Sequence, residues 1–188
     1  MEIRPAELSD CLFVARGICM ALHMDPTEEE LPLIANICQR EDVLYSYKNT
    51  LIAWEGDTPL GICLCYDGKG YHEIRLRTFA LFQQMHEALG EKEIEDDLDF
   101  EHFEDETCEG EYYIDSLAVM PEFRRRGIAT QLLKAQINKG SQLGLPVATL
   151  LVDPDNPDAQ KLYYNCGFKY REDVYAFGQI FWKLALAL

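Results

Sequence analysis

The chain has 188 residues, of which 48% are hydrophobic, and a formal net charge of −16 at pH 7. The hydrophobic fraction excludes a disordered chain, and no apolar run reaches the ~20 residues that span a bilayer, so no membrane partner is expected. The charge argues against nucleic acid as a partner, because that affinity rests on cations that neutralise phosphates, whereas it permits a cationic substrate.

The first ninety residues predict a short strand, two helices, a β-hairpin and a longer helix. Apolar residues recur at helical spacing in the helices, and Thr27 with Glu30 forms a capping box before the second one. Gly56 and Asp57 mark the hairpin turn, and Gly90 ends the longer helix. The expected elements are a strand at Glu2–Arg4, a helix after Ser9 or Asp10, a helix after Thr27, strands at Leu51–Glu55 and Pro59–Tyr66, and a helix at Tyr71–Leu89.

The rest of the chain begins with a strongly acidic stretch, Glu91–Glu111, which is typical of a solvated loop. Strands and helices then alternate. This order predicts an α/β fold with a mixed sheet and helices on both faces. The expected elements are a strand at Tyr112–Val119, a helix at Gly127–Lys139 stopped by Gly140, a strand at Pro146–Val152, a helix at Pro157–Cys166, and a hairpin of Phe168–Ala176 with Gln179–Leu186.

The stretch most informative about chemistry is the basic loop that follows the strand Tyr112–Val119. Arg124, Arg125 and Arg126 precede Gly127 and the start of a helix. The first amides of a helix have no partner within it, and the helix dipole favours an anion there. A phosphate-bearing ligand at this helix start is therefore predicted. No Gly-Lys-Ser/Thr follows, and two glycines of a dinucleotide fingerprint are missing, so neither of those motifs is present.

Two motifs carry a family resemblance. Arg124-x-x-Gly127-x-Ala129, preceded by Leu117-Ala118-Val119-x-Pro121, resembles the (Gln/Arg)-x-x-Gly-x-(Gly/Ala) signature of the GNAT superfamily of N-acetyltransferases. Downstream, Asn156-x-x-Ala159-x-x-Leu162-Tyr163-x-x-x-Gly167-Phe168 is similar to the second conserved block of that family. The match covers about residues 112–170. The helical and acidic segment at about 70–110 has no counterpart in the minimal family pattern.

The resemblance implies a GNAT-like fold: a mixed, mostly antiparallel central sheet with splayed parallel strands and helices on both faces. It implies a single N-acetyltransferase domain over residues 1–188, with an insertion at about 70–110. The implied activity is acetyl transfer from acetyl-CoA to a primary amine of a small molecule or peptide, by direct attack in a ternary complex. The implied cofactor-binding residues are Leu117, Ala118, Val119, Arg124, Arg125, Arg126, Gly127, Ile128, Ala129, Thr130, Asn156, Ala159 and Tyr163.

Acyl transfer from a thioester to an amine needs a proton acceptor and a proton donor. Tyr163 matches the family tyrosine that protonates the leaving thiolate. Tyr113 stands where some relatives have a glutamate base, so Asp115 or Glu111 could accept the proton, or Asp115 could have a structural role. Asp115 is expected to share a strand face with Tyr113, Leu117 and Val119. The missing glutamate also leaves open a non-catalytic acyl-CoA-binding or interaction module.

The helical and acidic segment has two interpretations. Its carboxylates form either a solvated loop or an acidic wall beside the acceptor site. Arg75 and Arg77 either hold an acidic acceptor or lie on a solvated helix face. We expect the segment to pack over the acceptor end of the groove.

The remaining features concern location, metal and assembly. The N-terminus lacks a signal-peptide pattern, and the seven cysteines include no CxxC pair, which favours reduced thiols in a cytoplasmic protein. Cys63 and Cys65 are expected to be core residues on one face of a strand. Neither these residues nor the histidines show metal-ligand spacing, so no metal is expected. The assembly is expected to be a monomer or homodimer.

Overall fold

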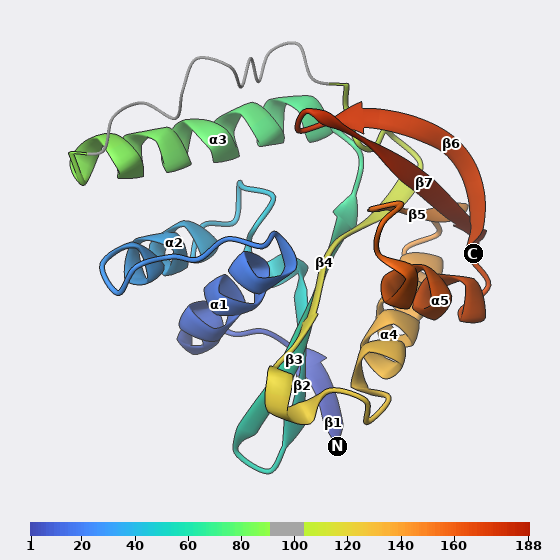
Figure 1. Ribbon diagram of the computed structural model, residues 1–188. Helices are drawn as coiled ribbons and strands as arrows, with labels where there is room; N and C mark the ends of the chain where they lie inside the picture. Colours follow the sequence, from blue (N-terminus) through green and yellow to red (C-terminus); the bar gives the residue numbers. More distant parts are fainter. Residues whose placement is uncertain (91–103) are drawn as a thin grey trace.

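The computed structural model describes residues 1–90 and 104–188, which form one seven-stranded sheet with helices on both faces (Figure 1). The strand order is β1-β2-β3-β4-β5-β7-β6, and only β4 and β5 pair in parallel. The elements are β1 Glu2–Pro5, α1 Cys11–Ala21, α2 Glu30–Cys38, β2 Thr50–Glu55, β3 Thr58–Asp67, α3 Tyr71–Ala88, β4 Glu111–Val119, α4 Ile128–Gln142, β5 Val147–Val152, α5 Pro157–Asn165, β6 Lys169–Ala176 and β7 Gln179–Ala187.

Two hydrophobic cores lie on opposite faces of the sheet. Strand β3 supplies both, because successive side chains alternate between faces: Ile62 belongs to the core under α1 and α2, and Cys63 belongs to the core under α4. Cys65 shares the face of Cys63, with their sulfur atoms 3.7 Å apart, as predicted. The predicted mixed α/β sheet with helices on both faces is confirmed.

The predicted elements recur with ends shifted by a few residues, and one glycine was misinterpreted. Gly140 does not stop α4, which continues to Gln142 and is followed by Gly144 at φ 77°. A Cβ on Gly140 would lie 2.5 Å from Cδ1 of Tyr112. Glycine is therefore needed here for close packing of the helix on β4, and not for a left-handed turn.

The parallel strands β4 and β5 pair over only three positions. The pairs run from Glu111 with Val147 to Tyr113 with Thr149, after which the strands separate. Beside the separation, the register of β3 with β4 shifts between Leu64 and Cys65, leaving Asp115 as the extra residue of a β-bulge. The bulge also changes the face of the sheet on which the β4 residues after it lie. Tyr113 packs in the core under α1, whereas Val119 packs in the core under α4, so the expected shared face was wrong.

A buried ion-pair cluster holds the point where the strands part. Glu111 accepts from Nζ of Lys183 at 2.8 Å and from the Arg171 guanidinium at 2.6 Å. The hydroxyls of Thr107 and Thr149 also donate to it. Burial alone would raise the pKa of Glu111, but Lys183 and the two hydroxyls outweigh it, so its pKa lies below the usual 4.5. The cluster joins β4, β5, β6 and β7.

Glu111→Gln should lower the free energy of unfolding by about 3 kcal/mol at pH 7, because it leaves the buried Lys183 cation unpaired. Urea unfolding measures this. The folded-state pKa of Glu111 is depressed, so its contribution is full above pH 4.5 and disappears as pH falls through the folded-state value. The difference from wild type should shrink accordingly in acid.

The control is Glu41→Gln, which removes the exposed ion pair of Glu41 with Lys48. That pair should contribute less than about 1 kcal/mol. Equal losses in the two variants would contradict a stabilising role for the Glu111 cluster.

Candidate active site

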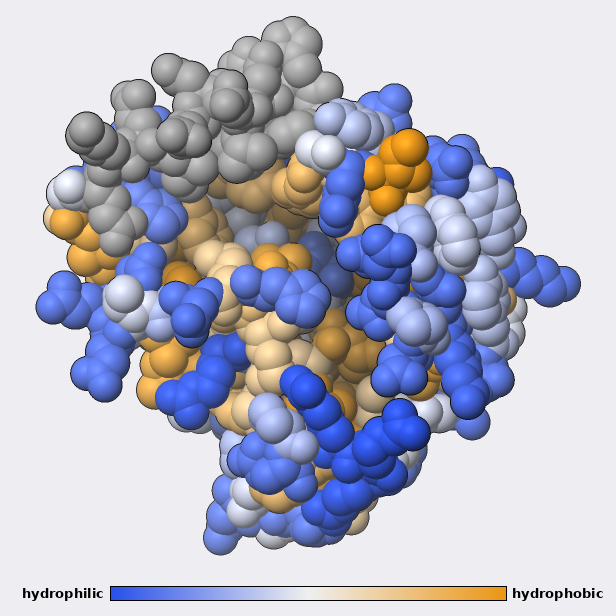
Figure 2. Space-filling model, in the orientation of Figure 1, coloured by the Kyte–Doolittle hydropathy of each residue, from blue (hydrophilic) through white to orange (hydrophobic). Residues whose placement is uncertain are grey.

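A cavity of about 1090 Å³ opens where β4 and β5 separate. Figure 2 shows a hollow near the middle of the face shown, with both hydrophobic and hydrophilic residues in it. At one end, here named the groove end, it is lined by Leu117, Leu151, Asn156, Ala159 and Tyr163. At the other, here named the aromatic end, it is lined by Tyr45, Leu76 and Phe82, from the loop before β2 and from α3.

The groove end is built by β4, β5 and the start of α5. Asn156 is the N-cap of α5, where its side-chain oxygen accepts from the Ala159 amide at 3.1 Å. Pro157 follows at the first helical position. The predicted residues Asn156, Ala159 and Tyr163 thus line one cavity together with Leu117.

The basic loop before α4 has an unusual backbone. Arg125 has φ 63° and Gly127, the N-cap of α4, has φ 76°. Positive φ at a non-glycine residue is uncommon and concentrates at functional sites. A Cβ on Gly127 would meet nothing within 4 Å, so there is open space beside the first amides of α4. This fits the predicted anion site.

The three arginines of the loop do different things. Nε of Arg124 donates to the Val119 carbonyl at 3.1 Å, and Arg126 pairs with Glu55 at 2.7 Å, so both brace the loop. The Arg125 side chain is 87% exposed and lies 3.9 Å from Asp158 at the start of α5. Arg125 therefore projects beside the groove end and can approach an anion there.

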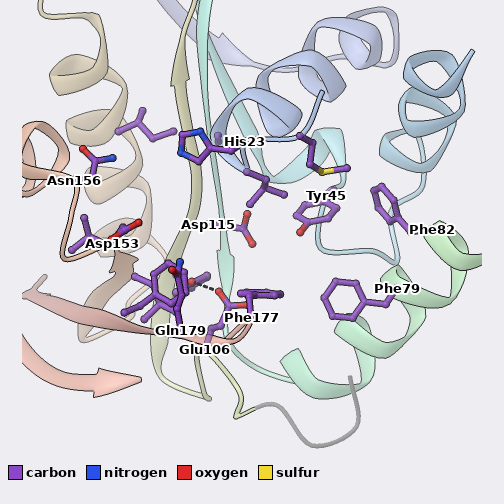
Figure 3. A pocket seen from close by; sticks show the side chains of 18 of the residues that line it. His23, Tyr45, Phe79, Phe82, Glu106, Asp115, Asp153, Asn156, Phe177 and Gln179 are labelled. Carbon is purple, nitrogen blue, oxygen red and sulfur yellow. Dashed lines mark hydrogen bonds between the residues drawn. The ribbon is translucent and has the colours of Figure 1, made fainter. Parts of the chain in front are cut away.

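Asp115, the bulged residue of β4, faces the cavity (Figure 3). Its two carboxylate oxygens accept from the Tyr66 hydroxyl at 2.6 Å and the Ser116 hydroxyl at 2.7 Å. Burial raises its pKa, and these two hydrogen bonds act in the opposite direction. Asp115 is thus a carboxylate held by neutral donors, which suits a group that accepts a proton.

Glu106 is a second cavity carboxylate, and the sequence did not single it out. Its oxygens accept from the hydroxyls of Tyr71 and Tyr113. Burial, and then the charge of Asp115, raise its pKa. Tyr113 stands at the position where some relatives have glutamate. Its hydroxyl donates a hydrogen bond to Glu106, which comes from another part of the chain. Only its place in the acidic stretch could have signalled Glu106, and that signal does not distinguish it from its neighbours.

The acidic stretch is in part built into the fold. Asp105 pairs with the buried Arg75 at 3.2 Å and lies 3.1 Å from Nδ1 of His72. The interpretation of Arg75 as part of a solvated helix face was wrong, because Arg75 is buried against Asp105, and Arg75 is not among the cavity-lining residues. Arg77 instead donates to the Asp42 carbonyl at 3.0 Å. The part of the stretch at 91–103 lies outside the described residues.

Tyr163 lies on α5, with its ring against Phe168 at 6.1 Å between centroids. Burial raises its pKa, and the nearby Cys63 and Cys65 act in the same direction. The phenol therefore keeps its proton at neutral pH and is available as a donor.

Other predicted residues lie away from the cavity. Ala118 and Val119 pack in the two cores, and the loop of Arg124–Thr130 lies beyond the lining residues, at the far end of β4. Glu111 belongs to the ion-pair cluster and not to the cavity, so it is not available as a base.

Among residues 1–90 and 104–188, no cluster of three His, Cys, Asp or Glu side chains could hold a metal. No helix in those ranges is long and apolar enough to cross a membrane.

The splayed sheet and the basic helix start together define the acetyltransferase fold. The model of the acetyltransferase (GNAT) family matches residues 18–168, and the chain belongs to that family. No curated protein sequence matched the chain.

Solved structures agree with this assignment. One described as an acetyltransferase is 26% identical, with a TM-score of 0.79 over 100% of this chain and 99% of its own. An N-acetyltransferase from Staphylococcus aureus Mu50 is 20% identical, with a TM-score of 0.73 over 99% and 100%. The NatC complex bound to Gag peptide and CoA has a chain that is 18% identical, with a TM-score of 0.58 over 100% and 99%. The latter two support the fold alone.

Proposed function

We propose that the protein is an acetyl-CoA-dependent N-acetyltransferase that acetylates a primary amine of a small molecule or peptide by direct attack in a ternary complex. The observation that carries this proposal is the parting of β4 and β5 after three pairs, with a cavity that reaches from the gap to Asp115 and Tyr163. Membership of the GNAT family supports it. The same fold occurs in a chain of the NatC complex bound to Gag peptide and CoA.

The residues present fit acetyl-CoA, which would supply an activated acetyl thioester. The amides of Arg125–Thr130 would hold the pyrophosphate at the start of α4, where Gly127 leaves open space. The backbone of Leu117 and Val119 would pair with the pantetheine arm, because β5 no longer pairs with β4 beyond Tyr113. Asn156 and Ala159 would contact the arm from α5.

Asp115 would accept the proton of the acceptor amine, directly or through water. Alkyl amines have a pKa near ~10 and attack only when neutral, so a proton acceptor is needed at neutral pH. A backbone amide of β4 would stabilise the oxyanion formed at the acetyl carbonyl. Tyr163 would then donate its proton to the leaving thiolate.

The test combines binding with turnover. Calorimetric titration with acetyl-CoA in the presence of a chelator should show binding without metal, and weaker binding at higher salt. Free CoA thiol should then appear with amines and not without them. Absence of binding up to millimolar acetyl-CoA would overturn the proposal. Binding without thiol release from any amine would instead support the non-catalytic module.

The proposed setting is the cytoplasm, with acetyl-CoA and an amine as partners and no metal. The seven free cysteines support a reducing compartment. We also propose that the chain is a single catalytic domain in which the segment at about 70–110 is an insertion. The supporting observation is that α3 and Glu106, both from this segment, line the cavity.

A further inference from the structure

The wall of the aromatic end is apolar. Tyr45 precedes β2, and Leu76 and Phe82 come from α3. Tyr45 and Phe82 pack edge to face, with centroids 5.8 Å apart. In Figure 3 these two rings stand on the side of the cavity away from Asn156. Surfaces of this kind bind a hydrophobic or aromatic group.

The charged side chains described along the cavity are carboxylates, with no arginine or lysine among them. Glu106 and Asp115 accept hydrogen bonds from neutral hydroxyls. The third carboxylate, Asp153, accepts from the Asp155 amide and lies on the side of Asn156 (Figure 3). Among the described lining residues there is no Arg or Lys, and the other titratable side chains, apart from tyrosines, are His23 and His86. The nearby Arg75 is paired with Asp105.

We infer that the acceptor is a small primary amine on an uncharged hydrophobic body, with its ammonium group facing Glu106 and Asp115. This inference rests on the proposed acetyl transfer and names its substrate class. A carboxylate on the acceptor would meet carboxylates without an arginine or lysine among the described lining residues. A second ammonium would lie against apolar side chains, and burying an unpaired charge is costly. A long peptide would place backbone amides against the same apolar wall.

The test uses matched pairs of acceptors. 2-Phenylethylamine is compared with phenylalanine, which adds a carboxylate, and hexylamine with 1,6-diaminohexane, which adds a cation. We expect kcat/KM to favour the monoamine at least tenfold in each pair, equivalent to about 1.4 kcal/mol. 2-Phenylethylamine should also exceed the peptide Phe-Ala-Ala-amide.

Preference for phenylalanine, the diamine or the peptide would overturn the inference and leave acetyl transfer intact. Thiol release from none of these probes would overturn the inference as well. In that case, acetyl-CoA titration shows whether the cofactor site has failed too.

Two variants test the wall itself. Leu76→Asp places a carboxylate on the aromatic end, and Leu143→Asp, at the distant end of α4, is the matched control. Leu76 is 36% exposed and Leu143 is 61% exposed, so both variants should fold. Leu76→Asp should raise the ratio of kcat/KM for 1,6-diaminohexane over hexylamine at least tenfold, while Leu143→Asp leaves it unchanged. An unchanged ratio in Leu76→Asp would contradict the assignment of this wall to the acceptor.

Discussion

Gly127→Glu should weaken acetyl-CoA binding at least a hundredfold, a loss of about 2.7 kcal/mol. The open space beside Gly127 is the expected position of a phosphate, and the new carboxylate would enter it with the same sign of charge. Repulsion between close like charges of this kind costs several kcal/mol. Calorimetric titration measures the affinity, and circular dichroism checks the fold.

The matched control for this variant is Gly144→Glu. Gly144 also has a positive φ, 77°, and a Cβ added to it would meet nothing within 4 Å, but it lies after the other end of α4. Both variants add one negative charge and a left-handed strain of about 1–2 kcal/mol. Only Gly127→Glu should lose affinity. Equal affinities in the two variants would remove the phosphate site from this loop.

Tyr163→Phe should lower kcat on the order of 10²–10⁴-fold, the usual contribution of a general acid. The ring stays against Phe168, so packing is largely kept, and only the hydroxyl is lost. The affinity for acetyl-CoA should change little, because the missing interaction acts in the chemical step. Steady-state kinetics with a productive amine and titration with acetyl-CoA separate the two effects.

Tyr164→Phe is the control for the second variant, because it makes the same change one position along α5. Tyr164 is exposed and is not among the cavity residues. Its kcat should equal that of wild type. If Tyr163→Phe also retained full kcat, Tyr163 would not be the acid.

Local patterns predicted much of this fold. The capping box of Thr27 and Glu30 is formed by both hydrogen bonds, and helical spacing identified the buried face of α1. Such features depend on residues a few positions apart, which a sequence displays directly. The predicted groove residues Leu117, Asn156 and Tyr163 were likewise identified through two short motifs and lie on one cavity.

The parts that could not be predicted depend on contacts between distant segments. Glu106 is held in the cavity by a hydrogen bond from Tyr71, which lies 35 residues earlier in the chain. Glu111 is not available as a base, because it forms an ion pair with Lys183 on the last strand. Gly140 has the sequence context of a helix stop, and only the ring of Tyr112 shows that it is a packing residue. None of these partnerships follows from spacing along the chain.

The short pairing of β4 and β5 has a consequence for association between molecules. An ordinary open sheet has two edges, here β1 and β6. The separation of β4 from β5 creates two more edges inside the sheet. Exposed edges are templates on which foreign strands can add. These two inner edges move apart from the point where β4 and β5 stop pairing. The gap therefore admits a narrow extended chain. A regular strand cannot pair with both edges along its length, because a sheet keeps neighbouring strands 4.7–4.9 Å apart.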